Sequence, residues 1–413
     1  MTGAKPFDKV LVANRGEIAC RIIGSLHRLG IASVAVYSDA DAETLPVRLA
    51  GEAVRLGPAP PSASYLDASA IIDAALRTGA EAIHPGYGFL SERGDFAEQV
   101  EATGLVFIGP TPTQLRLFGA KHEARALAGA AGVPLLAASG LVTELGAALA
   151  AADDVGFPVL VKATAGGGGL GMRVCRDRDE LEREFAGAHR QASSAFGDGR
   201  VYLERYLPEA RHVEVQIIGD GTGRVVTLGD RDCSSQRRHQ KVLEETPAPG
   251  LPETLRSGLW TAAKSLAESL SYRSAGTVEF LVEVASGTIA FLEVNARLQV
   301  EHTVTEAVYG IDLVEWMLRI AAGDNTVLDR QLQQRGHAIE GRICAESPWR
   351  DHQPSAGTLT RVSFPPDVRV DTWVETGTEV TSHYDSLLAK VVAVGPTRTE
   401  AVSRLASALN DTR

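Results

Sequence analysis

Short apolar runs alternate with helical patterns over the first 110 residues, and this alternation limits the fold more than any other feature of the sequence. Runs at residues 9–13, 32–38, 81–88 and 105–110 read as strands, whereas 16–30 and 68–79 read as helices. The runs end in Gly, Asn or Pro, as parallel strands do where they open into ligand loops. We therefore predict a Rossmann-like α/β domain with such loops at residues 14–16 and 84–88. No GxGxxG follows the first strand pattern, so we do not expect a dinucleotide site.

Length and charge restrict the class of protein. A chain of 413 residues predicts two or three domains. With 41 Lys+Arg against 52 Asp+Glu, the net charge of −11 disfavours nucleic acid or anionic lipid as partners. We find no apolar run approaching a membrane span and no signal-peptide hydrophobic region, and we expect a cytoplasmic protein without membrane contacts. Four scattered cysteines without a CxxC pair, Cys20, Cys175, Cys233 and Cys344, are expected to be reduced thiols.

Two further regions follow. Between about residues 115 and 330, HVEVQII (212–218) and RVVTLGD (224–230) alternate polar and apolar residues, which predicts antiparallel strands with one wet or functional face. From residue 331 onward several short strand patterns precede a helical pattern at 397–410, which indicates a third, mainly β unit. That last helix stops at Arg413 without a capping signal, so we expect part of a closing element to be missing.

A glycine-rich loop follows one strand pattern. PVLVKATAGGGGLGM (158–172) places Lys162 at the end of an apolar strand and glycines at 166–169 and 171. Glycines let consecutive backbone N–H groups approach phosphate oxygens while a lysine supplies charge. A flexible hinge is the alternative, but the loop lacks the serines of a linker, so we predict phosphate binding. Without a following GK[ST] it is not a Walker A loop.

A row of alternating polar residues lies near position 300. If the segment is extended, one face carries Glu293, Asn295, Arg297, Gln299 and Glu301. A solvated strand face is the bland alternative, yet such a sequence of carboxylate, amide and guanidinium groups favours a binding face. With Glu279 on the preceding strand pattern, Glu293 and Asn295 offer oxygen ligands that suit Mg²⁺ beside nucleotide phosphates. His302 is interpreted as structural.

A basic segment precedes these residues. GDRDCSSQRRHQK (229–241) gathers five cationic side chains in an acidic protein: Arg231, Arg237, Arg238, His239 and Lys241. We interpret the segment as an anion site rather than a solvated face. Nucleic-acid binding would require interleaved aromatic residues and a larger basic field.

Together, the glycine loop after Lys162, RDCSSQRRHQK and EVNARLQVEH resemble the ATP-grasp biotin carboxylases. The resemblance extends over essentially the whole chain, through the segments LVANRGEIACRI, HPGYGFLSE, GTVEF, PSAGTLT and YDSLLAKV. Within the family, the sequence is most similar to the urea or guanidine carboxylase branch. The resemblance implies a preATP-grasp domain at 1–114, an ATP-grasp domain at 115–330 with a mobile lid at about 132–203, and a truncated C-terminal domain at 331–413.

The family's site residues match positions of this sequence. The resemblance implies ATP contacts by Lys121, Lys162, Gly168, Gly169, Met172, Glu204, Arg205, Leu207, His212, Gln236, His239 and Leu281. It implies Mg²⁺ ligation, or Mn²⁺ in its place, by Glu279, Glu293 and Asn295. It implies bicarbonate binding by Lys241, Arg297, Gln299 and the backbone of Val300. Arg93, Ala296 and Arg205 depart from the family's usual residues, and none of these changes removes a reacting group.

The same resemblance implies the chemistry. Glu301 is expected to act as general base on bicarbonate, which attacks the γ-phosphate of ATP to give carboxyphosphate, and Arg342 to stabilise the biotin enolate. None of the three methionines is followed by lysine, so biotin is expected on a separate carrier domain or chain. The resemblance implies a homodimer or a place in a larger complex, with a carboxyltransferase component as a further partner. The alternatives are a carbamoyl-phosphate-synthetase-like ligase and a catalytically silent nucleotide-binding subunit; Lys241, RLQVEH and Arg342 favour biotin.

Overall fold

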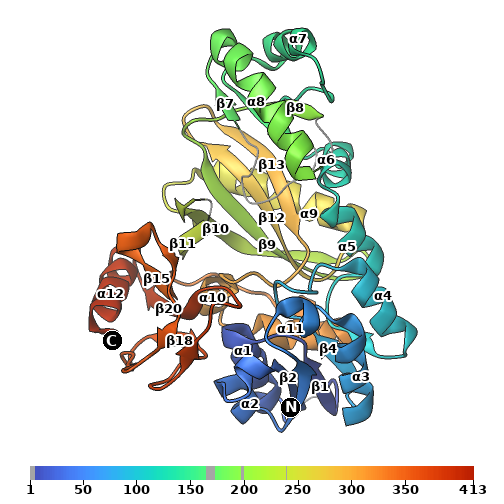
Figure 1. The fold of residues 1–413 in the computed structure, drawn as a ribbon, viewed down its shortest axis with the longest axis vertical. Coiled ribbons are helices and arrows are strands. Elements are labelled where there is room, and N and C mark those ends of the chain that lie inside the picture. The colour runs from blue at the N-terminus through green and yellow to red at the C-terminus, as the bar shows by residue number, and fades with distance from the viewer. Residues whose placement is uncertain (1–4, 164–172, 197–199, 239) are drawn as a thin grey trace.

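A computed structural model describes residues 5–163, 173–196, 200–238 and 240–413. The molecule has four parts (Figure 1): an N-terminal α/β unit, a long central sheet, a small sheet beyond the far end of the central sheet, and a C-terminal extension to one side. Gly168, Gly169, Met172 and His239, which the sequence assigned to ATP, lie outside the described residues.

The N-terminal unit is a doubly wound parallel sheet with the strand order β3-β2-β1-β4-β5. Alternate residues of β1 enter opposite cores: Leu11 packs with α3, whereas Val10 packs with α1. This confirms the Rossmann-like prediction. Its strands are β1 (Lys9–Val12), β2 (Ala32–Ser38), β3 (Glu52–Gly57), β4 (Ala82–His84) and β5 (Val106–Phe107), and its helices are α1 (Gly16–Arg28), α2 (Leu45–Leu49), α3 (Ala68–Thr78), α4 (Gly94–Ala102) and α5 (Pro112–Gly119).

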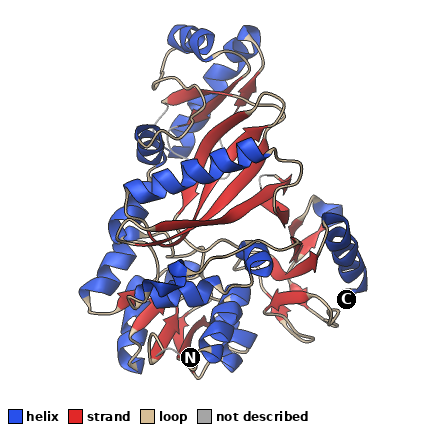
Figure 2. Ribbon diagram, turned by 180° about the vertical axis from the view of Figure 1, so that it is seen from behind, coloured by secondary structure: helices blue, strands red, loops and turns tan. Residues whose placement is uncertain are grey.

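The central sheet has eight strands in the order β13-β12-β9-β10-β11-β14-β20-β18, and every neighbouring pair is antiparallel. Helix α9 (Glu253–Ser269) crosses one face (Figure 2), where Leu259 and Leu266 share a core with Val213 and Val215 of β9. The strands from this part of the chain are β9 (Arg211–Asp220), β10 (Val225–Arg237), β11 (Gln240–Thr246), β12 (Arg273–Glu283) and β13 (Thr288–Asn295).

Three C-terminal strands extend this central sheet instead of forming a sheet of their own. They are β14 (His337–Cys344), β18 (Arg369–Thr372) and β20 (Leu387–Gly395). The join is the pairing of β11 with β14, from Leu243 opposite Gly341 to Thr246 opposite Ala338. The remaining elements here are the pairs β15 (Glu346–Ser347) with β16 (Gln353–Pro354) and β17 (Gly357–Thr358) with β19 (Glu379–Val380), and helix α12 (Arg398–Asp411).

A small antiparallel sheet, β7-β6-β8, has its own core (Figure 1, top). Leu149 of α7 and Phe185 of α8 pack there against Val159 and Leu203. Its elements are α7 (Leu145–Val155), β6 (Val159–Ala163), β7 (Arg173–Cys175), α8 (Arg178–Phe196) and β8 (Val201–Arg205); α6 (Lys121–Ala130) precedes it, and α10 (His302–Tyr309) and α11 (Leu313–Ala321) follow β13. Residues 164–172 carry the glycine loop and lie outside the described ranges.

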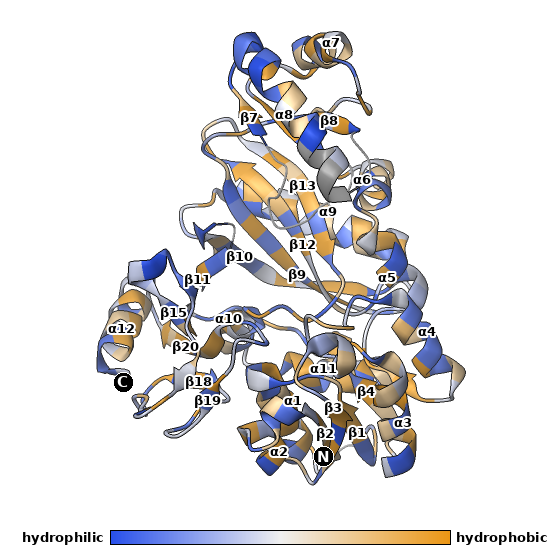
Figure 3. Ribbon diagram, viewed as in Figure 1, coloured by the Kyte–Doolittle hydropathy of each residue, from blue (hydrophilic) through white to orange (hydrophobic). Residues whose placement is uncertain are grey.

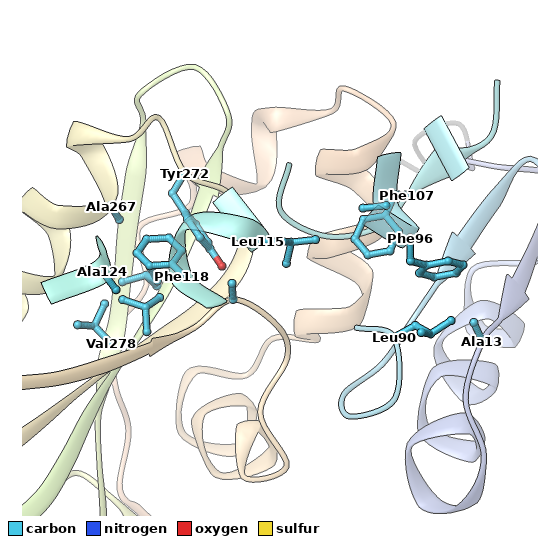
Figure 4. Close-up of a cluster of buried hydrophobic side chains, with 14 of the residues drawn as sticks. Ala13, Leu90, Phe96, Phe107, Leu115, Phe118, Ala124, Ala267, Tyr272 and Val278 are labelled. Carbon is cyan, nitrogen blue, oxygen red and sulfur yellow. The ribbon is translucent and has the colours of Figure 1, made fainter. Parts of the chain in front are cut away.

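Hydrophilic and hydrophobic bands alternate along the central strands (Figure 3), because successive side chains of a strand face opposite sides. The apolar side joins the N-terminal unit through one core, in which Phe96 meets Phe107 edge-on and Phe118 meets Tyr272 (Figure 4). The polar side carries the site described below. All four cysteines are free, and none of the helices in the described part of the chain is long and apolar enough to span a bilayer.

Candidate active site

Lys241 of β11 lies at the centre of a buried cluster of carboxylates. Its Nζ donates to Glu301 Oε1 at 2.6 Å, to Glu214 Oε2 at 2.7 Å and to Glu279 Oε1 at 2.9 Å. The three carboxylates come from the N-cap of α10, from β9 and from β12. Charges removed from water require such partners, so Lys241 and the acids stabilise one another's ionised forms.

Strand register explains why these side chains meet. Glu214 of β9 lies opposite Glu279 of β12 on one side and opposite Arg231 of β10 on the other. Arg231, which is completely buried, donates to Glu214 Oε1 at 2.5 Å and to Gln216 Oε1 at 2.7 Å. The face of HVEVQII that the sequence marked as wet or functional is therefore a buried polar layer, and the strands are antiparallel as predicted.

The cluster sets distinct pKa values for its members. Burial opposes ionisation of Glu301, but Lys241, Arg342 and Arg231 outweigh it and hold the pKa of this carboxyl well below its ordinary value. For Glu214, burial and the neighbouring charge of Glu301 prevail and raise the pKa. Burial lowers the pKa of Lys241, but the charges of Glu214 and Glu301 outweigh burial, and the pKa lies well above its usual value. Glu301 and Lys241 are thus both charged at neutral pH.

Arg342 of β14 brings the C-terminal strands into the site. Its Nη2 donates to Glu301 Oε2 at 3.1 Å, while Nε donates to Glu244 Oε1 at 2.7 Å. Glu244 and Glu340 lie opposite each other on β11 and β14, and both are fully buried. Burial raises the pKa of Glu244 to about 8 and that of Glu340 to about 7. Glu301 therefore lies between two cations supplied by different strands.

The predicted extended row from Glu293 to Glu301 is wrong in its second half. Strand β13 ends at Asn295, and α10 begins at His302. The turn between them closes locally, since the carbonyl of Gln299 lies 2.7 Å from His302 Nδ1. Arg297 folds back within this turn, donating to Asn295 Oδ1 at 2.9 Å and to Gln299 Oε1 at 2.7 Å. Buried His302 fits its predicted structural part.

The predicted metal ligands lie around one end of this turn. Glu279 and Glu293 are opposite each other on β12 and β13, and Asn295 Nδ2 donates to Glu279 Oε1 at 2.9 Å. Glu279 is buried, whereas Glu293 is partly exposed and lies 3.1 Å from Lys121 Nζ. Two carboxylates and an amide oxygen are the ligand types that Mg²⁺ prefers, so the donor set fits this ion.

The predicted ATP contacts fall into separate groups in the structure. Lys162 of β6 pairs with Glu204 of β8, which also accepts from Arg125 at 2.9 Å. His212 Nε2 lies 2.8 Å from Glu279 Oε2, and Gln236 Nε2 lies 2.9 Å from His212 Nδ1. The remaining candidates are Arg205 at the end of β8, bonded to the carbonyl of Phe157, Leu207 two residues later, Leu281 opposite His212 on β12, and Lys121 at the start of α6.

The interpretation of the basic segment as one anion site needs correction. Arg231 is held by Glu214, Arg237 pairs with Glu346, and Arg238 pairs with Asp351 in the hairpin between β10 and β11. Successive side chains of β10 face opposite sides of the sheet, and Arg238 lies in the hairpin after it, so these cations point in different directions. Of the described members, Lys241 and Arg231 enter the carboxylate cluster.

Sequence reasoning missed four residues of this region: Glu214, Glu244, Glu340 and Lys390. Each is an ionisable residue within a strand of the central sheet, and each is fully buried. A lone charge inside a buried strand requires a partner, and this signal was present in HVEVQII and LLAKVVAV.

Comparison with known proteins covers nearly the whole chain. Residues 6–115 match the family model "Biotin carboxylase, N-terminal domain", 120–328 match "Carbamoyl-phosphate synthase L chain, ATP binding domain", and 340–413 match "Biotin carboxylase C-terminal domain". Urea amidolyase of Lachancea kluyveri is 50% identical over 99% of this chain, which spans 22% of that protein. Biotin carboxylase of Pseudomonas aeruginosa is 48% identical over 98% of this chain and 90% of its own length.

The fold has a close match among solved structures. The biotin carboxylase domain of the Hydrogenobacter thermophilus 2-oxoglutarate carboxylase, crystallised as a dimer with MgADP, ADP and bicarbonate, gives a TM-score of 0.89 at 42% identity. The match covers 98% of this chain and 90% of that one.

Proposed function

The chain belongs to the biotin carboxylase family, and we propose that it carries out the ATP-dependent carboxylation of biotin. ATP phosphorylates bicarbonate to give ADP and carboxyphosphate. Carboxyphosphate then breaks down to CO₂ and phosphate, the phosphate takes the N1 proton of biotin on a carrier domain, and N1 bonds to CO₂. The observation that carries this proposal is the position of Glu301, a buried carboxylate held ionised between Lys241 and Arg342. Such a group is available as a base next to cations that attract an anionic substrate.

Bicarbonate would bind beside Lys241 through Arg297, Gln299 and the backbone of Val300. Without substrate, Lys241 donates to Glu301 and to two other carboxylates, Glu214 and Glu279. A bicarbonate anion bound there would share this positive charge. Sharing that charge raises the proton affinity of Glu301 when the substrate is in place. Glu301 can then take the bicarbonate proton and make the oxygen nucleophilic.

The remaining roles follow from the groups at either side. Lys121, Lys162, His212 and Gln236 would contact ATP, with Glu204, Arg205, Leu207 and Leu281 along its base, and the glycine loop over its phosphates. Glu279, Glu293 and Asn295 would hold Mg²⁺, which when bound would neutralise phosphate charge. Arg342 would stabilise the biotin oxyanion, since its guanidinium is fixed beside Glu301 and Glu244.

The proposal extends to the assembly. The chain spans about a fifth of the urea amidolyase that it matches. We therefore propose that it works with a carrier domain and a carboxyltransferase, which passes the carboxyl group to an acceptor. We propose a urea- or guanidine-carboxylase-type system, supported by that match. Acyl-CoA carboxylation is the alternative, because the methylcrotonoyl-CoA carboxylase subunit alpha of Oryza sativa is also 50% identical, over 98% of this chain. We also propose a homodimer and a cytoplasmic location, where the four free thiols stay reduced.

ADP release by the purified chain tests the function. With Mg-ATP, we expect release that depends on bicarbonate and rises with free biotin. In Arg342→Gln, the rate of biotin-stimulated release should fall by about 10²–10³-fold, as for loss of one oxyanion donor. The matched variant Arg404→Gln on exposed α12 should keep the stimulation. A rate of ADP release that does not change when biotin is added would refute the proposal. Because residues 120–328 match a carbamoyl-phosphate synthase model, ammonia replaces biotin in a parallel reaction, and stimulation by ammonia alone would favour that second function.

A further inference from the structure

Lys390 of β20 is a completely buried lysine that contacts two parts of the molecule outside its own strand. Its Nζ donates to the carbonyl oxygen of Val300 at 2.8 Å and lies 2.8 Å from Glu17 Oε1 of α1. Glu17 in turn accepts from the hydroxyl of Tyr87 at 2.6 Å. One ammonium group therefore joins the N-terminal unit, the C-terminal strands and the turn before α10.

The contact with Glu17 accounts for the burial of the charge, but the contact with Val300 needs another explanation. A buried ammonium is stabilised by an opposite charge, and Glu17 provides one, with Asp371 Oδ2 at 4.0 Å beyond it. The Val300 carbonyl adds no net charge. What this hydrogen bond does is fix the peptide that immediately precedes Glu301.

Strand register makes this grip specific. Lys390 lies directly opposite Arg342 where β14 and β20 pair, so both side chains leave the same face of the sheet. Arg342 donates to the carboxylate of Glu301, and Lys390 donates to the carbonyl of Val300. Two neighbouring cations thus hold two consecutive residues, one by its side chain and one by its backbone.

We propose that Lys390 is a positioning residue for bicarbonate: by holding the Val300 carbonyl it orients the Val300 N–H and the Glu301 carboxylate toward the substrate. The inference rests on the function proposed above, in which both groups meet bicarbonate. Lys390 itself touches no reacting atom. Its loss affects bicarbonate more than ATP, because Lys162, Lys121 and His212 contact other elements.

Two variants separate positioning from charge neutralisation. Lys390→Met removes both contacts and leaves Glu17 without its cation, whereas Lys390→Met combined with Glu17→Gln also removes the unpaired charge and keeps an acceptor for Tyr87. We expect the single variant to lose thermal stability and the double variant to regain it. In both, the KM for bicarbonate should rise on the order of tenfold or more, as for loss of one charged hydrogen bond, with the KM for ATP nearly unchanged. Lys264→Met on the exposed face of α9 is the matched control.

A double variant with the bicarbonate KM of the wild-type chain would overturn the proposal, since Lys390 would then only neutralise Glu17. Amide hydrogen exchange of residues 296–305, followed without substrate, decides the point independently of turnover. Faster exchange in both variants supports the positioning role, and unchanged exchange in the double variant refutes it. A wild-type chain without bicarbonate-dependent ADP release would refute the proposed function, while the exchange result would still decide the part played by Lys390.

Discussion

Glu301→Gln separates chemistry from structure at the centre of the site. The amide keeps one acceptor oxygen in place of two, so it can accept from Lys241 or from Arg342 but not from both. Lys241 still has Glu214 and Glu279, and Arg342 still has Glu244. The structural loss is thus one charge-assisted hydrogen bond, about 1.5–3 kcal/mol, which lowers Tm by a few degrees.

The expected catalytic loss is larger. Removal of a general base lowers kcat by about 10²–10⁴-fold, which corresponds to about 3–5 kcal/mol of transition-state free energy. Bicarbonate-dependent ADP release measures kcat, and calorimetry measures ATP affinity, which should change less than about twofold because Glu301 contacts none of the proposed nucleotide residues. Cys233→Ser is the matched control, since its Sγ lies 3.8 Å from Glu301 Oε1 in the same buried cluster. A kcat within tenfold of wild type would refute the assignment of Glu301 as base.

Lys162→Ala should weaken ATP binding by about 10–100-fold, as for one charged hydrogen bond, while Glu204 keeps Arg125 as partner; an unchanged calorimetric affinity would contradict the phosphate contact. Glu293→Gln should raise the Mg²⁺ concentration needed for half-maximal ADP release without lowering Tm, because this side chain is partly exposed; no change in the Mg²⁺ titration would remove it from the ligand set. Burial raises the pKa of Glu340 from 4.5 to about 7, so its contribution to stability is present at low pH and is lost as pH rises through about 7. The free energy of unfolding of Glu340→Gln should therefore rise relative to that of the wild type between about pH 5 and about pH 8, by up to about 3 kcal/mol. A difference in thermal unfolding that stays constant with pH would argue against this.

Much of the fold was readable because apolar patterns report on local structure. The βαβ rhythm of the first domain and the antiparallel strands around His212 are found where the sequence predicted them. The continuation of the central sheet into β14, β20 and β18 was not readable, because pairing between β11 and β14 joins residues about 95 positions apart and depends on register rather than composition.

The site shows the same division. Polar residues next to Glu301 in the sequence were found from their spacing, although the strand that was expected to align them ends at Asn295. Glu244 and Glu340 were missed because each faces the site from another strand, and nothing local distinguishes their burial from solvent exposure. Only the assembled sheet brings their charges together.

The pairing of β11 with β14 has a consequence for any attempt to divide the chain. If the polypeptide were cut between Arg330 and His337, β11 would become an edge strand with a free row of backbone N–H and C=O groups and with Leu243 along it. Such edges associate with one another. Separation of the two pieces would also remove Arg342, which donates a hydrogen bond to Glu244. The sheet therefore makes the nucleotide-binding segment and the C-terminal strands a single unit of expression and folding, although their sequences match different family models.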